Sequence, residues 1–217
     1  ITAEYGNIIS SGSEVSLKQA IISALSQLIP TRSNILVVGL GNRDITPDAI
    51  GPLAVDRMFA TRHIGRTLRE QLGLEGLNSV SALIPGVLGK TGIEAVEIIR
   101  GTVQRTSPDA VIVIDALAAR HTERLCRTVQ LCNTGISPGS GVENSRSEIS
   151  EAVLGVPVTA IGIPTVVDIR TLIYDLTESA APISTPMMVT PTDIDLQIRR
   201  LAELLAQSLN MFLQPSL

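Results

Sequence analysis

Aromatic residues are scarce in this chain: two tyrosines, two phenylalanines and no tryptophan occur among 217 residues. Because 44% of the residues are hydrophobic but only 2% are aromatic, isoleucine, valine, leucine and alanine must build the core. An aliphatic core of this kind is typical of a parallel sheet covered by helices. The length suits one domain with a substantial core. We therefore expect residues 1–217 to form a single α/β domain.

Cysteine and positive charge are also scarce. Cys126 and Cys132 are too few for the disulfide framework of a small secreted domain, and reduced structural thiols are the expected alternative. The formal charge is −4 with both signs scattered, so no basic patch indicates nucleic-acid binding. No apolar stretch is long enough to cross a bilayer. We expect a cytoplasmic protein that makes no direct contact with nucleic acid or membranes.

Short apolar runs alternate with amphipathic segments along the chain. The runs predict strands at residues 34–40, 80–84, 110–114, 128–131 and 158–163. Helices are predicted after Ser16 as N-cap up to Pro30, at residues 47–62, 93–106 and 169–177, and from a cap at Thr190 to about Phe212. Strands that alternate with helices indicate a mostly parallel sheet flanked by helices. A glycine-rich polar segment at residues 135–150 predicts a loop that shapes a site.

Two aspartates are the leading candidates for chemistry. Asp48 lies soon after the run at residues 34–40, and Asp115 directly follows the run at residues 110–114. In an open α/β sheet, residues just past the carboxyl ends of parallel strands line the crevice where ligands bind. Two carboxylates at one site can perform acid/base hydrolysis without a metal or a serine.

Both aspartates also have structural explanations. Asp48 follows Thr46-Pro47, so it resembles an acid in the first turn of a helix, where it stabilises the helix dipole. Asp115 resembles a turn former after a strand. Asp44, Asp168 and Glu94 are weaker candidates, with solvated or capping roles as the alternative. Because Asp48 and Asp115 both follow predicted strands, their combined position favours a catalytic role for these two aspartates.

Other site signatures are absent or incomplete. Gly39-Leu40-Gly41 follows a strand, but Asp44 stands where a dinucleotide-binding motif needs its third glycine. The sequence has neither a phosphate-binding Gly-Lys-Ser/Thr loop nor a Gly-x-Ser-x-Gly nucleophile elbow. Only His63 and His121 are available for a triad or a metal centre, and His63 is expected near a helix end, where a cation is favoured anyway.

Nine segments, in order along the chain, resemble the spore germination protease family. They are GLGN at 39–42, TPDAIGP at 46–52, TRH at 61–63, IPGV at 84–87, TGIE at 91–94, IDALAAR at 114–120, SPGSG at 137–141, IGIPTVVD at 161–168 and MVTP at 188–191. The resemblance implies an atypical aspartic endopeptidase that degrades small acid-soluble spore proteins in the spore interior. It also implies a homo-oligomer without cofactor or metal. The family's two essential aspartates match Asp48 and Asp115.

The resemblance extends to the fold and leaves two other functions open. It implies a sheet like that of the hydrogenase maturation proteases, a phosphorylase/hydrolase-like fold. Ser137 stands in the glycine-rich loop where germination proteases often have histidine. We expect Arg43 and Arg120 to orient an acidic substrate side chain. The alternatives are a metal-dependent maturation-type protease and an inactive paralogue that binds spore proteins.

Overall fold

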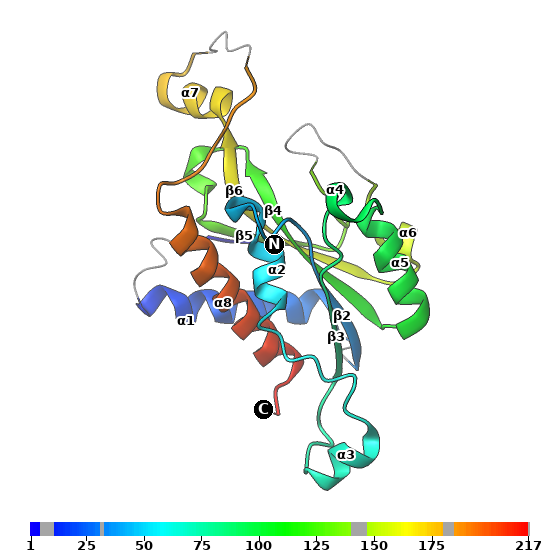
Figure 1. Ribbon diagram of the computed structural model, residues 1–217. Coiled ribbons are helices and arrows are strands. Elements are labelled where there is room, and N and C mark those ends of the chain that lie inside the picture. The colour runs from blue at the N-terminus through cyan, green and yellow to red at the C-terminus, as the bar shows by residue number, and fades with distance from the viewer. Residues whose placement is uncertain (5–10, 31–32, 140–146, 180–184, 217) are drawn as a thin grey trace.

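The computed structural model describes residues 1–4, 11–30, 33–139, 147–179 and 185–216. Within these residues a seven-stranded sheet has the order β1-β5-β6-β4-β2-β3, with β7 paired to β6 (Figure 1). The strands are β1 Thr2–Glu4, β2 Asn34–Gly39, β3 Ser79–Leu83, β4 Ala110–Ala119, β5 Thr128–Cys132, β6 Val158–Asp168 and β7 Met188–Val189. Helices flank the sheet, so the predicted α/β fold class is confirmed.

The sheet combines parallel and antiparallel pairs. β3, β2, β4 and β6 are mutually parallel, as the alternation of strands and helices predicts. β5 runs antiparallel to β6, and β1 and β7 add further antiparallel pairs. The connection from β4 to β5 holds only the short turn η2 (Thr122–Arg124). A crossover to a parallel neighbour needs about a dozen residues, so β5 returns in the opposite direction.

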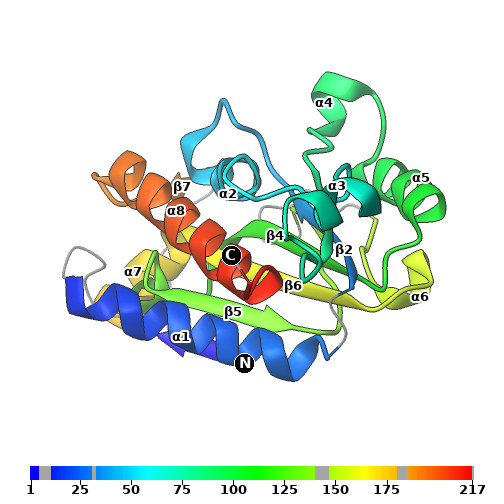
Figure 2. The same cartoon turned by 90° about the horizontal axis from the view of Figure 1, so that it is seen from below.

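Helices cover the two faces of the sheet unequally. One face, here called the α8 face, packs against α1 (Ser11–Leu28), α2 (Ile50–Val55) and α8 (Ile194–Leu213). The other face, the α5 face, packs against α5 (Ala95–Thr106) and α6 (Glu151–Leu154). Figure 2 shows α1 and α8 lying across each other. The remaining helices are α3 (Arg66–Gln71), α4 (Leu88–Thr91) and α7 (Ile169–Thr177). None of the helices among the described residues is long and apolar enough to span a membrane.

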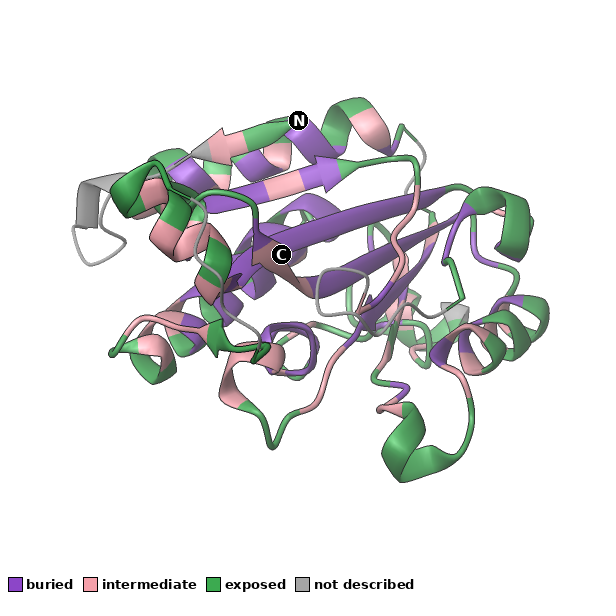
Figure 3. Ribbon diagram, turned by 90° about the horizontal axis from the view of Figure 1, so that it is seen from above, coloured by how far each residue is buried: buried purple, intermediate pink, exposed green. Residues whose placement is uncertain are grey.

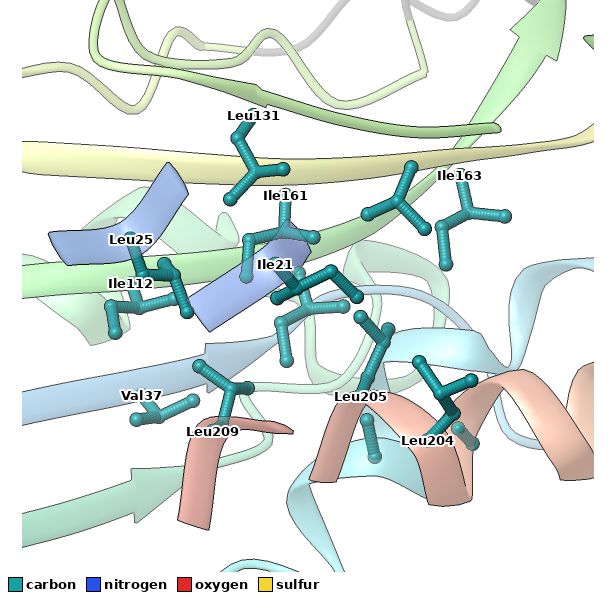
Figure 4. Close-up of a cluster of buried hydrophobic side chains, with 14 of the residues drawn as sticks. Ile21, Leu25, Val37, Ile112, Leu131, Ile161, Ile163, Leu204, Leu205 and Leu209 are labelled. Carbon is teal, nitrogen blue, oxygen red and sulfur yellow. The ribbon is translucent and has the colours of Figure 1, made fainter. Parts of the chain in front are cut away.

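The core is aliphatic, as the composition predicts. On β2, Ile35 and Val37 face the α8 face, whereas Leu36 and Val38 face the α5 face. The central strands are buried on both faces (Figure 3), which explains their near-continuous apolar sequences. The cluster on the α8 face is drawn in Figure 4, with labelled side chains from α1, α8 and four strands: Ile21, Leu25, Val37, Ile112, Leu131, Ile161, Ile163, Leu204, Leu205 and Leu209.

The predicted helix at residues 47–62 is confirmed only over Ile50–Val55. A 3-10 turn, η1 (Thr46–Asp48), stands at its start, and α2 ends at Val55. The side chain of Asn210 on α8 explains the early end. Its amide donates to Arg57 O at 3.0 Å, and its Oδ1 accepts from the Phe59 N–H at 2.9 Å. In a longer helix these two backbone groups would bond within the helix. Here the Asn210 side chain on α8 bonds them instead.

Several predicted boundaries also need correction. α1 begins at Ser11, so Ser16 lies inside the helix rather than at its cap. Thr190 does not cap α8, because its hydroxyl contacts Pro191 O and Asp193 precedes the first helical residue. His63 lies in a turn well after α2. β4 and β6 run several residues past their predicted ends, while α7 keeps its predicted bounds. Of the predicted loop at 135–150, residues 140–146 lie outside the described residues.

Candidate active site

Asp48 lies at the end of a tight loop that folds back onto the carboxyl end of β2. Gly41 has a φ of +111°, and a Cβ added there would lie 2.0 Å from Asp48 O. Only glycine allows this approach at a backbone angle that other residues rarely adopt. The Asn42 N–H donates to Asp48 Oδ2 at 2.7 Å. The half-buried carboxylate is therefore held against the strand end by a backbone amide.

Asp115 lies inside β4 and is only 5% exposed. The sequence placed it just past the strand, but β4 continues to Ala119 because it stays paired with β6. Its neighbour β2 has its last paired residue, Gly39, opposite Ile114. Asp115 is thus the first residue of β4 beyond the end of β2. The turn-former explanation is wrong, since the Asp115 backbone is paired in the sheet.

The segments that carry the two aspartates meet at the carboxyl edge of β2 and β4. The Leu40 N–H donates to Ile114 O at 2.8 Å. Gly51, at the start of α2, packs on the same two strand ends: an added Cβ would lie 2.3 Å from Leu40 O and 2.6 Å from Ile114 O. η1 itself contacts β4, β6 and α8. Asp48 therefore sits close to the strand end from which Asp115 follows.

Asp115 and the segment that carries Asp48 are related differently to the two faces of the sheet. Side chains alternate along β4, and Val111 and Val113 belong to the α5 face. Asp115 has the same parity as these valines, so its side chain leaves the sheet on the α5 face. Asp48 precedes α2, which covers the α8 face.

Charged side chains around the Asp48 loop form exposed ion pairs. Arg43 pairs with Asp56, just after α2, and both side chains are well exposed. Lys90 of α4 pairs with Asp44, and this ammonium holds the pKa of Asp44 below its ordinary value. Arg120, which follows β4 directly, is exposed. Lys90 was not predicted as a site residue, because α4 is a single turn without a periodic pattern.

The weaker candidates have structural roles. Asp168 is the N-cap of α7 and accepts from the Arg170 N–H at 2.8 Å. The Arg170 guanidinium lowers the pKa of Asp168 to about 2. Glu94 forms a capping box at the start of α5.

His121 pairs with an aspartate of α7, and the possible metal ligands among the described residues do not cluster. His121 Nδ1 lies 3.7 Å from Asp175 Oδ1 on α7. The pKa of that carboxyl is lowered mainly by the hydroxyl and amide of Thr122. Across the described parts of the chain, no three His, Cys, Asp or Glu side chains gather as a metal site would require.

Thr165 on β6 was not predicted from the sequence as a candidate site residue. Its hydroxyl is buried and, among the described residues, has no hydrogen-bond partner. The register between β4 and β6 shifts at this point, with Leu117 opposite Pro164 and Ala118 opposite Val166. Thr165 is therefore the extra residue of a β-bulge, a feature often found beside active sites. Pro164 was an available signal, because proline within a strand marks a bulge or an edge.

Comparisons with known proteins point to one family. A family model described as germination protease matches residues 13–178. The germination protease of Caldanaerobacter subterraneus subsp. tengcongensis is 45% identical over 91% of this chain and 71% of its own length. The Clostridium acetobutylicum protein is 41% identical over 84% of this chain and 66% of its own length. The Bacillus velezensis protein is 52% identical over 72% of this chain but only 42% of its own length.

A solved structure also matches over most of its length. The NiFe hydrogenase maturation protease HycI from Thermococcus kodakarensis covers 86% of this chain and 98% of its own. The TM-score is 0.48 and the sequence identity is 20%.

Proposed function

Since the chain belongs to the germination protease family and is a protease that acts in spore germination, we propose that it is an endopeptidase that degrades small acid-soluble spore proteins. We assign catalysis to Asp48 and Asp115. The observation that carries this proposal is the meeting of their segments at the carboxyl edge of β2 and β4, with Leu40 bonded to Ile114 and Gly51 packed on both.

The proposed reaction is hydrolysis by a carboxyl pair that shares one proton. The ionised carboxylate takes a proton from a water molecule, and the resulting hydroxide attacks the peptide carbonyl carbon. The protonated carboxyl donates its proton to the carbonyl oxygen, which gives a gem-diol intermediate. The carboxyl that took the proton from water then gives it to the leaving amine as the C–N bond breaks, while the other carboxylate takes a proton back from a gem-diol hydroxyl. Two close carboxylates cannot both ionise cheaply, so the pair supplies one base and one acid.

We propose Arg120 ahead of Arg43 as the residue that orients an acidic side chain of the substrate. Arg120 follows β4 only five residues after Asp115 and is exposed. The Arg43 guanidinium already pairs with Asp56. An acidic substrate group would have to displace that carboxylate before it could bind Arg43.

The test compares the unaltered chain with Asp48→Asn and Asp115→Asn variants on purified small acid-soluble spore protein. Each substitution should reduce kcat by about 10²- to 10⁴-fold, because it removes one proton-transfer group. Asp195→Asn, which changes an exposed carboxylate on α8, is the matched control and should keep full activity. Cleavage that survives either catalytic substitution at the control rate would refute the assignment.

Two further arms separate the alternatives. Activity that a chelator abolishes and a divalent ion restores would indicate a metal-dependent protease of the maturation type. Binding of spore protein without cleavage by the unaltered chain would indicate an inactive paralogue.

We propose further that the protein works in the cytoplasm of the germinating spore, as a homo-oligomer of one-domain subunits. We propose no direct contact with nucleic acid or membrane. The spore proteins are its partners as substrates. Light scattering of the purified protein tests the oligomer, and a single cooperative unfolding transition tests the single domain.

A further inference from the structure

Lys90 lies on α4, a single helical turn that follows β3 and buries none of its residues. Glycines in the left-handed region stand on both sides of this turn, Gly86 with a φ of +78° and Gly92 with a φ of +70°. The Thr91 hydroxyl accepts from the Ile93 N–H at 3.1 Å and so closes the end of the turn. The backbone of α4, rather than the burial of its side chains, therefore fixes where Lys90 lies.

Three interactions in series join Lys90 to Asp48. The Lys90 ammonium pairs with the Asp44 carboxylate. The Asp44 N–H donates to Asn42 Oδ1 at 3.1 Å, and the Asn42 N–H donates to Asp48 Oδ2 at 2.7 Å. A movement of Asp44 therefore reaches the proposed catalytic carboxylate through a single intervening residue.

The Asp48 loop, residues 42–48, is also bonded within itself. The Ile45 N–H donates to Asn42 O at 3.1 Å, and the Asp48 N–H donates to Ile45 O at 2.8 Å. Arg43 ties this loop to the segment just after α2, whereas Lys90 ties it to α4, which follows a different strand. Because the loop is bonded internally, the loss of one tie should displace Asp48 together with its neighbours.

We propose that Lys90 is a positioning residue that holds the Asp48 loop in its active arrangement through Asp44. The inference rests on the proposed function and adds a residue to it. Both side chains of the pair are more than half exposed, and an exposed ion pair shifts an equilibrium by about fivefold at most. Lys90 therefore sets how much of the protein has Asp48 in place, and it takes no part in proton transfer.

The first experiment measures cleavage of spore protein by Lys90→Met at low ionic strength. The kcat should fall about two- to fivefold with KM unchanged, because fewer molecules hold Asp48 in place while substrate still binds. Lys18→Met removes the charge of the chain's other lysine, on α1, and is the matched control that should keep full kcat. A rise in KM at unchanged kcat would overturn the proposal, since it would show that Lys90 binds substrate.

The second experiment tests the ion pair itself. Asp44→Asn should lower kcat as much as Lys90→Met does, and the double variant should lower it no further, because each change breaks the same contact. Lys90→Arg keeps the charge and should retain most of kcat. Added salt should lower kcat of the unaltered chain toward the value of Lys90→Met, since mobile ions screen exposed charges. Losses that simply add in the double variant would overturn the proposed coupling.

The third experiment needs no activity. Hydrogen exchange followed by NMR reports on the amides of Asn42 and Asp44, which both donate within the loop. These amides should exchange about two- to fivefold faster in Lys90→Met than in the unaltered chain or in Lys18→Met. Faster exchange in a protein that cleaves no spore protein would support the link from Lys90 to the loop and overturn the proposed function. Equal exchange in Lys90→Met and the unaltered chain would overturn the positioning role whatever the activity.

Discussion

Replacing Gly51 with alanine is the sharpest test of how the fold positions Asp48. The new Cβ would lie 2.3 Å from Leu40 O and 2.6 Å from Ile114 O. Both oxygens belong to backbone at the strand ends, so no flexible side chain can give way. Ordinary contact begins near 3.4 Å, so the start of α2 must move about 1 Å away from the sheet, and η1 with it.

A displacement of that size predicts a larger loss of activity than of stability. A misplacement of 1 Å can cost about 10²-fold in rate, whereas overpacking a buried site costs about 1–3 kcal/mol. We therefore expect kcat/KM on spore protein to fall about 100-fold, while urea unfolding shows a protein that is destabilised but still folded. Circular dichroism checks that the helices persist.

Gly101 supplies the control for this substitution. It lies inside α5 with no atom within 4 Å of an added Cβ. Gly101→Ala should leave kcat/KM unchanged and stabilise the protein by roughly 0.5–1 kcal/mol, because alanine is the better helix former. A Gly51→Ala protein with full kcat/KM would refute the argument that this contact positions the site.

Three other properties follow from particular side chains. The Arg170 guanidinium lowers the pKa of Asp168 from 3.8 to about 2, so the stability this pair contributes is complete above about pH 4 and is lost as the pH falls toward 2. In urea unfolding, the free energy of unfolding of Arg170→Met should fall less over that pH range than that of the unaltered protein. Burial raises the pKa of Cys126 to about 12. Titration with a thiol reagent should therefore detect one reactive cysteine, Cys132, in the native protein and two in denaturant. Asn210→Ala removes two hydrogen bonds to the segment after α2 and should cost about 1–3 kcal/mol in urea unfolding.

The strands of the core could be predicted from the sequence because their signal is local. Residues 34–40 and 80–84 are apolar runs bounded by polar residues, and β2 and β3 match them within one residue. The position of Asp115 relative to the sheet could not be derived in this way. β4 extends past Ile114 because β6 continues beside it, and pairing with a distant strand leaves no pattern in Ala116-Leu117-Ala118-Ala119. The β-propensity of the residues alone does not predict pairing with a distant strand.

The segment around Asp48 shows the same limit. Thr46-Pro47-Asp48 carries genuine helix-start signals, and they produced one 3-10 turn instead of a long helix. The helix that follows ends where Asn210, far along the chain, bonds its last backbone groups. β1 and β7 were missed for a related reason, since strands of three and two residues exist only through their partners. The sequence predicts both aspartates as candidates for chemistry, but long-range contacts decide their placement.

The contact between α8 and the Asp48 segment has a consequence for the order of events during synthesis. η1 and α2 both pack on α8, which follows every other described element. Asp48 and Asp115 therefore leave the ribosome long before the helix that supports the Asp48 segment. A nascent chain can hold both carboxyls and still lack an assembled site. Assembly of the proposed site therefore requires that the region around Asn210 has been made.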